Sequence, residues 1–110
     1  MNDNEIYQKL TELKDKGIVA CLATIIETAG STPREAGAKM IICADGTLYG
    51  SVGGGCGESE VRSAALRSIL TTRKAELIEI NLTDDIGNRE GDVCGGTMRI
   101  FVEPLILQVP

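Results

Sequence analysis

The chain has 110 residues, of which 43% are hydrophobic and 25% are charged, so it can form one globular core and leaves no room for two. Only 3% of the residues are aromatic, and 11 basic against 16 acidic side chains give a net charge of −5, which argues against a nucleic-acid partner. The sequence contains no histidine, which excludes histidine-based acid–base catalysis and histidine-containing metal sites.

The sequence gives no sign of a membrane or secretory segment. No stretch approaches the roughly 20 consecutive apolar residues of a membrane span, and the first five residues are acidic and polar, unlike a signal peptide. We therefore expect a cytoplasmic protein without a membrane partner. The four cysteines include no CxxC pair, so free thiols are expected and a disulfide framework is not.

The first predicted element is an amphipathic helix over residues 3–16, because its apolar side chains recur at helical spacing. Asp3 is the predicted N-cap, and Gly17 supplies the left-handed residue that ends the helix. Two glutamate–lysine pairs at i,i+4 spacing predict a solvated outer face: Glu5 with Lys9, and Glu12 with Lys16.

Three strands are predicted next. Residues 18–26 form an almost continuous apolar run rich in β-branched side chains, which is typical of a strand buried on both faces in the centre of a sheet. Residues 27–37 indicate a long loop. Residues 38–44 and 47–52 are strand candidates joined at Asp45-Gly46, which predicts a two-residue hairpin with both residues at positive φ.

The second half of the chain predicts a helix and two further strands. Residues 58–72 return to helical spacing, with acidic residues at the start and basic residues toward the end. Residues 75–82 and 97–105 indicate strands. Along residues 97–105, Met98, Ile100 and Val102 alternate with Arg99, Phe101 and Glu103, which indicates that one face of the sheet is less buried than the other. We therefore expect a single α+β domain over residues 1–110, a mixed sheet with a β-hairpin and two amphipathic helices, whose strand order is not predicted.

A glycine-rich segment over residues 50–57 lies between a predicted strand and a predicted helix, where backbone N–H groups and the helix dipole favour an anion such as phosphate. The segment lacks the Lys-Ser/Thr of a P-loop and fits no GxGxxG pattern, and the alternative is a purely structural tight turn. Cys56 is either a thiolate stabilised by the helix start or a small packing residue. Cys21 and Cys43 lie in apolar strand patterns and are expected to be inert core residues.

Two other segments carry residues suited to ligand binding. Residues 92–97 place Cys94 beside two glycines, so this segment and the one around Cys56 could converge on one ligand and offer two sulfurs to a soft metal. The loop over residues 27–39 offers hydroxyls with the cations Arg34 and Lys39, a set suited to an oxyanion. The alternative for this loop is an ordinary surface connection.

Five sequence motifs of this chain closely resemble those of the XdhC/CoxI family, and the resemblance extends from about residue 19 to residue 105. The resemblance rests on Glu27-Thr28-Ala29-Gly30-Ser31-Thr32-Pro33-Arg34, Gly37-Ala38-Lys39-Met40, Gly50-Ser51-Val52-Gly53-Gly54-Gly55-Cys56, Cys94-Gly95-Gly96-Thr97 and Phe101-Val102-Glu103-Pro104. It implies an accessory protein of molybdenum hydroxylases such as xanthine dehydrogenase, which binds the molybdopterin (molybdenum) cofactor, protects it, assists its sulfuration and delivers it to the apoenzyme. A chaperone without catalysis of its own is therefore expected more than an enzyme.

By this resemblance and, for Lys39, by its charge, the cofactor-binding residues are expected to be Ser31, Thr32, Arg34, Lys39, Gly53, Gly54, Gly55, Cys56, Cys94, Gly95 and Gly96. The glycine backbone, Arg34 and Lys39 would hold the cofactor phosphate, and Cys56 and Cys94 are the candidates for contact with the dithiolene or the metal. The expected partners are a molybdenum hydroxylase apoenzyme, a cysteine desulfurase as sulfur source, and further copies of the chain in a homo-oligomer. Two alternatives stay open: a cysteine-dependent sulfur-transfer enzyme, and a structural oligomerisation module without a ligand.

Overall fold

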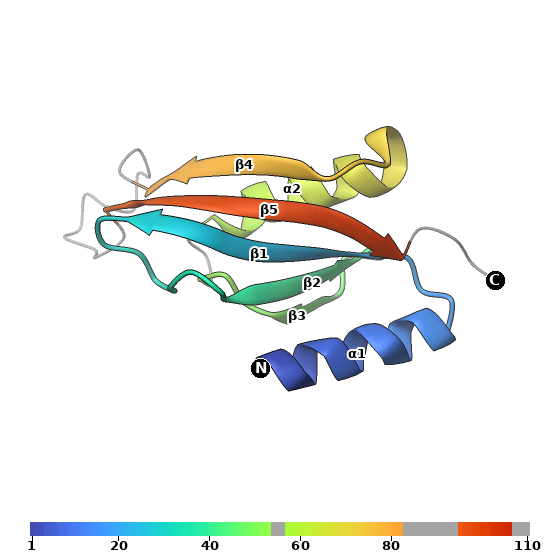
Figure 1. The fold of residues 1–110 in the computed structure, drawn as a ribbon. Helices are drawn as coiled ribbons and strands as arrows, with labels where there is room; N and C mark the ends of the chain where they lie inside the picture. Colours follow the sequence, from blue (N-terminus) through green and yellow to red (C-terminus); the bar gives the residue numbers. More distant parts are fainter. Residues whose placement is uncertain (54–56, 83–94, 107–110) are drawn as a thin grey trace.

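The middle of the fold is a five-stranded sheet of order β3-β2-β1-β5-β4 in a computed structural model that describes residues 1–53, 57–82 and 95–106 (Figure 1). The strands are β1 (Ala20–Ala29), β2 (Lys39–Cys43), β3 (Leu48–Gly50), β4 (Glu76–Asn81) and β5 (Thr97–Ile106). The α+β class is confirmed. The pairings between the described strands are all antiparallel, so the expected mixed sheet is wrong. The connection that contains the second helix runs from β3 to β4. These two strands lie at opposite edges of the sheet, so the connection creates no parallel pair.

The prediction of a central strand is confirmed by β1, which pairs with β2 on one side and β5 on the other. Ala20, Cys21 and Ala23 have no exposed surface, as expected of a strand covered on both faces. The strand is longer than predicted because its register with β5 shifts between Ile25 and Glu27, and pairing then continues to the end of the strand.

The β2–β3 hairpin is confirmed, but its connection has three residues, 44–46, and not two. The N–H of Cys43 donates to the carbonyl oxygen of Thr47 at 2.9 Å, which closes the hairpin around this connection. Only Gly46 has a positive φ, of 95°, while Asp45 accepts a hydrogen bond from the Thr47 N–H at 2.9 Å through its carboxylate. A single left-handed residue is what a three-residue loop with a glycine bulge requires.

The first helix is α1 (Asp3–Asp15), and its N-cap is Asn2 and not the expected Asp3. The side chain of Asn2 accepts from the Glu5 N–H, and the Glu5 carboxylate accepts from the Asn2 N–H, both at 2.8 Å. This reciprocal capping box satisfies two backbone donors at once, which a cap at the next residue would not do. The helix ends as predicted, with Gly17 at a φ of 70°.

The outer face of α1 carries ion pairs that differ in part from the expected ones. Because Glu5 closes the capping box, Lys9 pairs with Glu12 at 3.1 Å instead. The predicted pair of Glu12 with Lys16 is confirmed at 3.3 Å. Lys9 also lies 4.8 Å from the centre of the Tyr49 ring, which ties α1 to β3.

The second predicted helix is α2 (Glu58–Arg67), which continues as a π-helical turn, η1 (Ser68–Thr72). The apolar side chains at helical spacing are buried at Val61, Ala65 and Ile69, whereas Leu70 is 71% exposed. The change to π-helical geometry rotates the last turn relative to a regular helix. Neither α1 nor α2, within the described residues, is long and apolar enough to cross a membrane.

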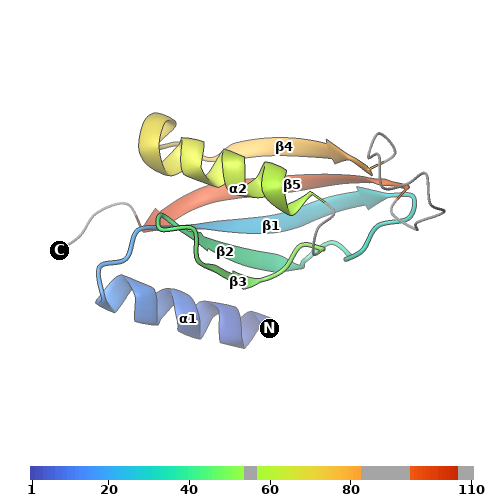
Figure 2. The same ribbon diagram turned by 180° about the vertical axis from the view of Figure 1, so that it is seen from behind.

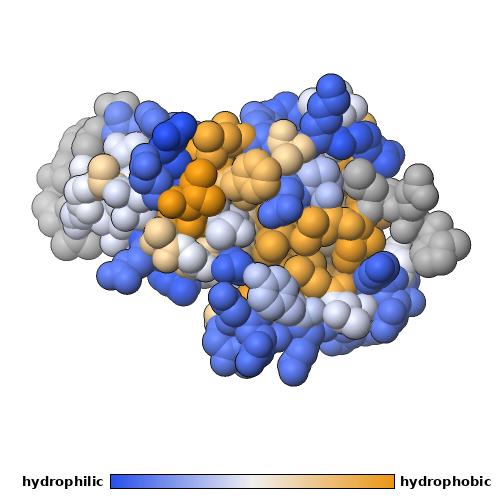
Figure 3. All heavy atoms as spheres, in the orientation of Figure 1, coloured by the Kyte–Doolittle hydropathy of each residue, from blue (hydrophilic) through white to orange (hydrophobic). Residues whose placement is uncertain are grey.

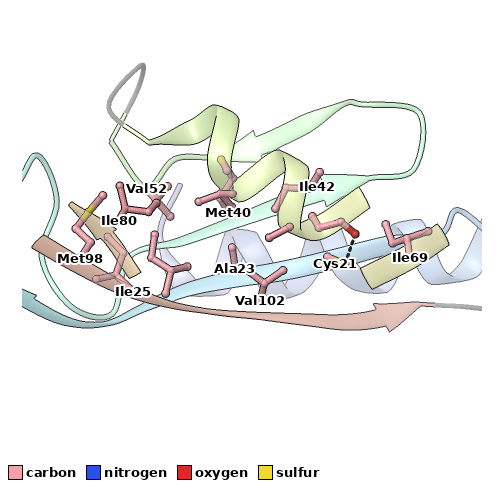
Figure 4. Close-up of a cluster of buried hydrophobic side chains, with 14 of the residues drawn as sticks. Cys21, Ala23, Ile25, Met40, Ile42, Val52, Ile69, Ile80, Met98 and Val102 are labelled. Carbon is pink, nitrogen blue, oxygen red and sulfur yellow. Dashed lines mark hydrogen bonds between the residues drawn. The ribbon is translucent and has the colours of Figure 1, made fainter. Parts of the chain in front are cut away.

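The two helices cover opposite faces of the sheet (Figures 1 and 2). The larger core lies under α2 and includes Ile25, Val52, Ile80 and Met98 (Figure 4). The smaller core lies under α1, over β1 and β2. The side chains of β5 alternate as predicted between the α2 core and the opposite face, where apolar groups remain visible beside α1 (Figure 3).

Candidate functional site

The described parts of the three segments that the sequence singled out lie at one end of the sheet. Ala29, at the end of β1, pairs with Thr97 at the start of β5, and Thr97 pairs with Asn81 at the end of β4. The start of β2 and the end of β3 lie at this same end, because Met40 pairs with Gly50. Antiparallel pairing therefore places residues 30–38 and 51–53, which follow β1 and β3, at the same end of the sheet as residues 95–96, which precede β5.

The loop after β1 is in backbone contact with the segment before β5. A Cβ atom on Gly96 would meet the carbonyl oxygen of Ala29 and would lie 2.6 Å from the carbonyl oxygen of Ser31. The Gly96 carbonyl in turn accepts from the N–H of Leu82 at 2.8 Å. Glycine is therefore required at position 96, where the segment before β5 contacts residues 29–31. The predicted convergence of residues 92–97 with the segment around Cys56 falls partly outside the described residues and stays a prediction.

The loop after β1 also reaches the turn after β3. Arg34 donates through Nη1 to the carbonyl oxygen of Ser51 at 3.1 Å. The Ser51 hydroxyl donates to the Glu58 carboxylate at 2.8 Å and accepts from the Gly53 N–H at 2.9 Å. Sequence reasoning missed Ser51 and Glu58 as positioning residues, although a hydroxyl before a glycine turn and a carboxylate at a helix start are the available signals.

The start of α2 has no side-chain cap from the residues that the structure describes. Its N-cap residue is Gly57, at a φ of 92°, which has no side chain to offer. A Cβ on Gly57 would lie 3.0 Å from the Ile80 side chain, so the helix start is pressed against the end of β4. First-turn N–H groups without a cap are the donors that suit an anion.

Arg34 and Lys39 border the same pocket of about 470 Å³, between the start of α1 and the loop before β2. Lys39 donates to the Gly37 carbonyl at 3.0 Å and pairs with Asp3 at 3.3 Å, and its side chain is 13% exposed. Thr32 donates to the Arg34 carbonyl at 2.9 Å and so shapes the turn that presents Arg34. The two predicted cations are thus neighbours, with Lys39 anchored to α1.

Four of the expected site residues lie outside the described residues: Gly54, Gly55, Cys56 and Cys94. The pairing of the two sulfurs is therefore still a prediction. Within residues 1–53, 57–82 and 95–106, no group of three or more Cys, Asp or Glu side chains is arranged to hold a metal ion.

The other two cysteines are confirmed as buried core residues with free thiols. Burial raises the pKa of Cys21 to about 11, and its thiol donates to the Ala65 carbonyl at 3.5 Å (Figure 4). Burial, and secondarily the charge of Asp45, also raises the pKa of Cys43. Both thiols stay protonated at neutral pH and are poor nucleophiles and metal ligands.

These features define an α+β domain whose glycine-rich connections gather at one end of an antiparallel sheet. Residues 13–81 match the XdhC and CoxI family, and the chain belongs to that family. Sequence resemblance had already indicated this family, so the expectation is confirmed.

Relatives and solved structures agree with this membership. The chain is 32% identical to the uncharacterized protein YqeB of Escherichia coli over 97 residues, which cover 88% of this chain and 18% of that protein. It is 35% identical to a probable xanthine dehydrogenase subunit of Bacillus subtilis over 86 residues, which cover 76% of this chain and 26% of that protein. The fold is similar to a crystal structure of a xanthine dehydrogenase from Bacillus halodurans, with a TM-score of 0.77 and 28% sequence identity. The match covers 94% of this chain and 30% of that one. The chain therefore spans between 18% and 30% of the length of these proteins.

Proposed function

We propose that this chain binds the molybdenum cofactor, protects it, assists its sulfuration and passes it to a molybdenum hydroxylase. The observation that carries the proposal is the hydrogen bond from Arg34 to Ser51, which joins a cationic loop to the glycine-rich segment before a helix whose N-cap residue is a glycine. Membership of the XdhC and CoxI family supports the molybdenum cofactor as the ligand, because two proteins that this chain matches are named as xanthine dehydrogenase proteins.

The residues around the glycine turn suit the phosphate of a pterin cofactor. A guanidinium has five N–H donors, and one of those of Arg34 is used on Ser51, so others can face an anion. The N–H groups at the start of α2 add dipolar attraction, and the absence of side chains on glycines lets a ligand approach the backbone. Gly53, with Gly54 and Gly55 after it, is proposed to contribute backbone donors.

The other proposed roles follow the chemistry of the residue types. Lys39 would add a second cation from the pocket that it shares with Arg34, and Ser31 and Thr32 would shape the loop. Gly95 and Gly96 would keep that loop close to β5. Cys56 and Cys94 are proposed to face the dithiolene or the metal, for which sulfur is a matched donor.

The bound cofactor supplies molybdenum redox chemistry to the recipient enzyme, and the residues of this chain hold and shield it. We propose that residues 1–110 act as one XdhC/CoxI-like unit in the cytoplasm. A hydroxylase apoenzyme would be the recipient and a cysteine desulfurase the source of sulfur.

The test is an anaerobic equilibrium titration of the purified chain with isolated molybdopterin cofactor. Arg34→Ala is expected to raise the Kd about tenfold or more, because charge-assisted hydrogen bonds contribute about 1.5–3 kcal/mol. Arg62→Ala is the matched control, since it removes the same charge from an exposed position on α2. A folded wild-type chain that shows no saturable binding, or an equal loss in both variants, would overturn the proposal.

A further inference from the structure

In the part of the chain that the structure describes, β4 is an edge strand to which another chain could pair. It is the last strand of the sheet order, paired with β5 on one side and with no described strand on the other. It has six residues, contains no proline and has a continuous register with β5. The opposite edge strand, β3, has three residues. A regular strand edge of this length is a template for adding another strand.

A groove lies beside this edge, between β4 and α2. Its volume is about 320 Å³, and it is lined by Ser59, Glu60, Ser63, Arg67 and Ile78. The two serines are small, so space remains between the helix and the strand edge. A strand added to β4 would place alternate side chains into this groove.

We propose that a second copy of this chain pairs with β4, so that the two β4 strands run antiparallel about a two-fold axis at Ile78. Residues that lie opposite each other in an antiparallel pair point to the same face. This register places Ile78 opposite its own counterpart, Leu77 opposite Glu79 of the partner, and Glu76 opposite Ile80 of the partner. It pairs residues 76–80 and sets no two like charges directly opposite.

The neighbouring registers are less favourable. An axis at Glu79 would set two carboxylates directly opposite each other, which destabilises a strand pair. An axis at Leu77 would pair only residues 76–78 of β4. The charge pattern and the length of the strand together therefore favour the axis at Ile78.

The charges on α2 are complementary in the same arrangement. Arg67, in its last turn, pairs with Glu76 at the start of β4 at 2.8 Å, and Gly57, before its first turn, lies against Ile80 near the end of β4. α2 thus runs opposite to β4. The two-fold axis would bring the acidic start of each α2, with Glu58 and Glu60, toward the end of the other helix that carries Arg67.

The spacing of the two helices allows this interaction. α2 lies over the middle strands of its own sheet, mainly β5. Two β5 strands separated by two β4 strands are three strand spacings apart, or about 14 Å. Extended arginine and glutamate side chains can bridge much of that gap, and the antiparallel helix dipoles attract each other.

Sedimentation equilibrium of the full 110-residue chain tests the proposal, with an expected mass near twice 11.7 kDa. Ile78→Lys is expected to raise the dimer Kd at least about tenfold, because two ammonium groups would meet at the axis. Circular dichroism and thermal unfolding establish whether this variant is folded. A wild-type chain that stays monomeric at its highest soluble concentration would overturn the proposal.

A charge reversal on the helix gives a second, independent test. Glu60→Lys and Asp15→Lys each change the net charge from −5 to −3, one beside the proposed interface and one at the exposed end of α1. Glu60→Lys is expected to weaken the dimer several-fold although general repulsion falls, whereas Asp15→Lys leaves it unchanged or tighter. A dimer insensitive to both Ile78→Lys and Glu60→Lys uses another surface, which would overturn the proposal. Because Arg34 lies outside this interface, Arg34→Ala is expected to leave the mass unchanged.

Discussion

Gly30 and Gly96 lie in backbone contact across the end of the sheet, so that a Cβ on Gly30 would stand 3.1 Å from the Cα of Gly96. This contact fixes the loop that carries Arg34 against the start of β5. Gly30 also has a φ of 73°, a conformation that other residues rarely adopt. The glycines of these connections therefore have a structural role that is independent of any ligand.

The first prediction follows from this contact. Gly96→Ala is expected to destabilise the fold by about 1–3 kcal/mol or more, because the new Cβ would press on the backbone around Ser31. Gly95→Ala is the control, since a Cβ there meets no atom of the described residues within 4 Å. Urea unfolding followed by circular dichroism measures both variants. Equal stability of the two variants would contradict the contact.

The second prediction concerns the capping box of α1. Asn2→Ala is expected to lower the free energy of unfolding by about 1 kcal/mol, because the Glu5 N–H loses its side-chain acceptor. Asn4→Ala, an exposed position in the first turn, is expected to have little effect. Thermal unfolding of both variants tests this difference. A larger loss for Asn4→Ala would contradict the assignment of the cap.

The third prediction concerns Glu58, whose carboxylate lies at the helix start proposed to face the phosphate. Glu58→Gln is expected to tighten cofactor binding roughly two- to fivefold, because it removes a negative charge near the anion and keeps an oxygen acceptor for the Ser51 hydroxyl. Glu103→Gln, on β5, removes the same charge elsewhere and serves as the control. Unchanged or weaker binding by Glu58→Gln would argue against an anion at this helix start.

The fourth prediction uses the raised pKa values of the buried thiols. In a chain with Cys56→Ser and Cys94→Ser, Cys21 and Cys43 are expected to resist an aromatic disulfide reagent at pH 8 until denaturant is added. A raised pKa keeps a thiol protonated, and for Cys21, whose pKa is about 11, the thiolate would form only near that pH. Rapid reaction of the folded chain at pH 8 would show that these thiols are more accessible than their burial indicates.

The fifth prediction addresses the two cysteines proposed to face the cofactor. Cys56→Ser with Cys94→Ser is expected to weaken cofactor binding and to shorten the lifetime of the bound cofactor in air, because hydroxyls replace the matched sulfur donors. The single variants separate the two contributions. If affinity and protection from oxidation are both unchanged, neither thiol takes part in binding.

Most of the elements could be predicted from local pattern. The apolar spacing of Val61, Ala65 and Ile69 and the alternation along β5 mark buried faces, because a helix or strand repeats its side-chain direction with a fixed period. One error, the helix cap, arose where neighbouring residues compete for the same role. Asn2 and Asp3 are both good caps, and only the reciprocal bonds with Glu5 select the first.

The sequence also identified the three segments of the candidate site, since glycines, hydroxyls and cations mark each one locally. Their meeting was not predictable in detail, because the contact of Gly30 with Gly96 and the bond from Arg34 to Ser51 join residues far apart in the chain. Such contacts depend on strand order and register, which arise when all strands pack against one core. Local periodicity therefore fixes the elements, whereas long-range pairing fixes which loops share a site and which strand is left at the edge.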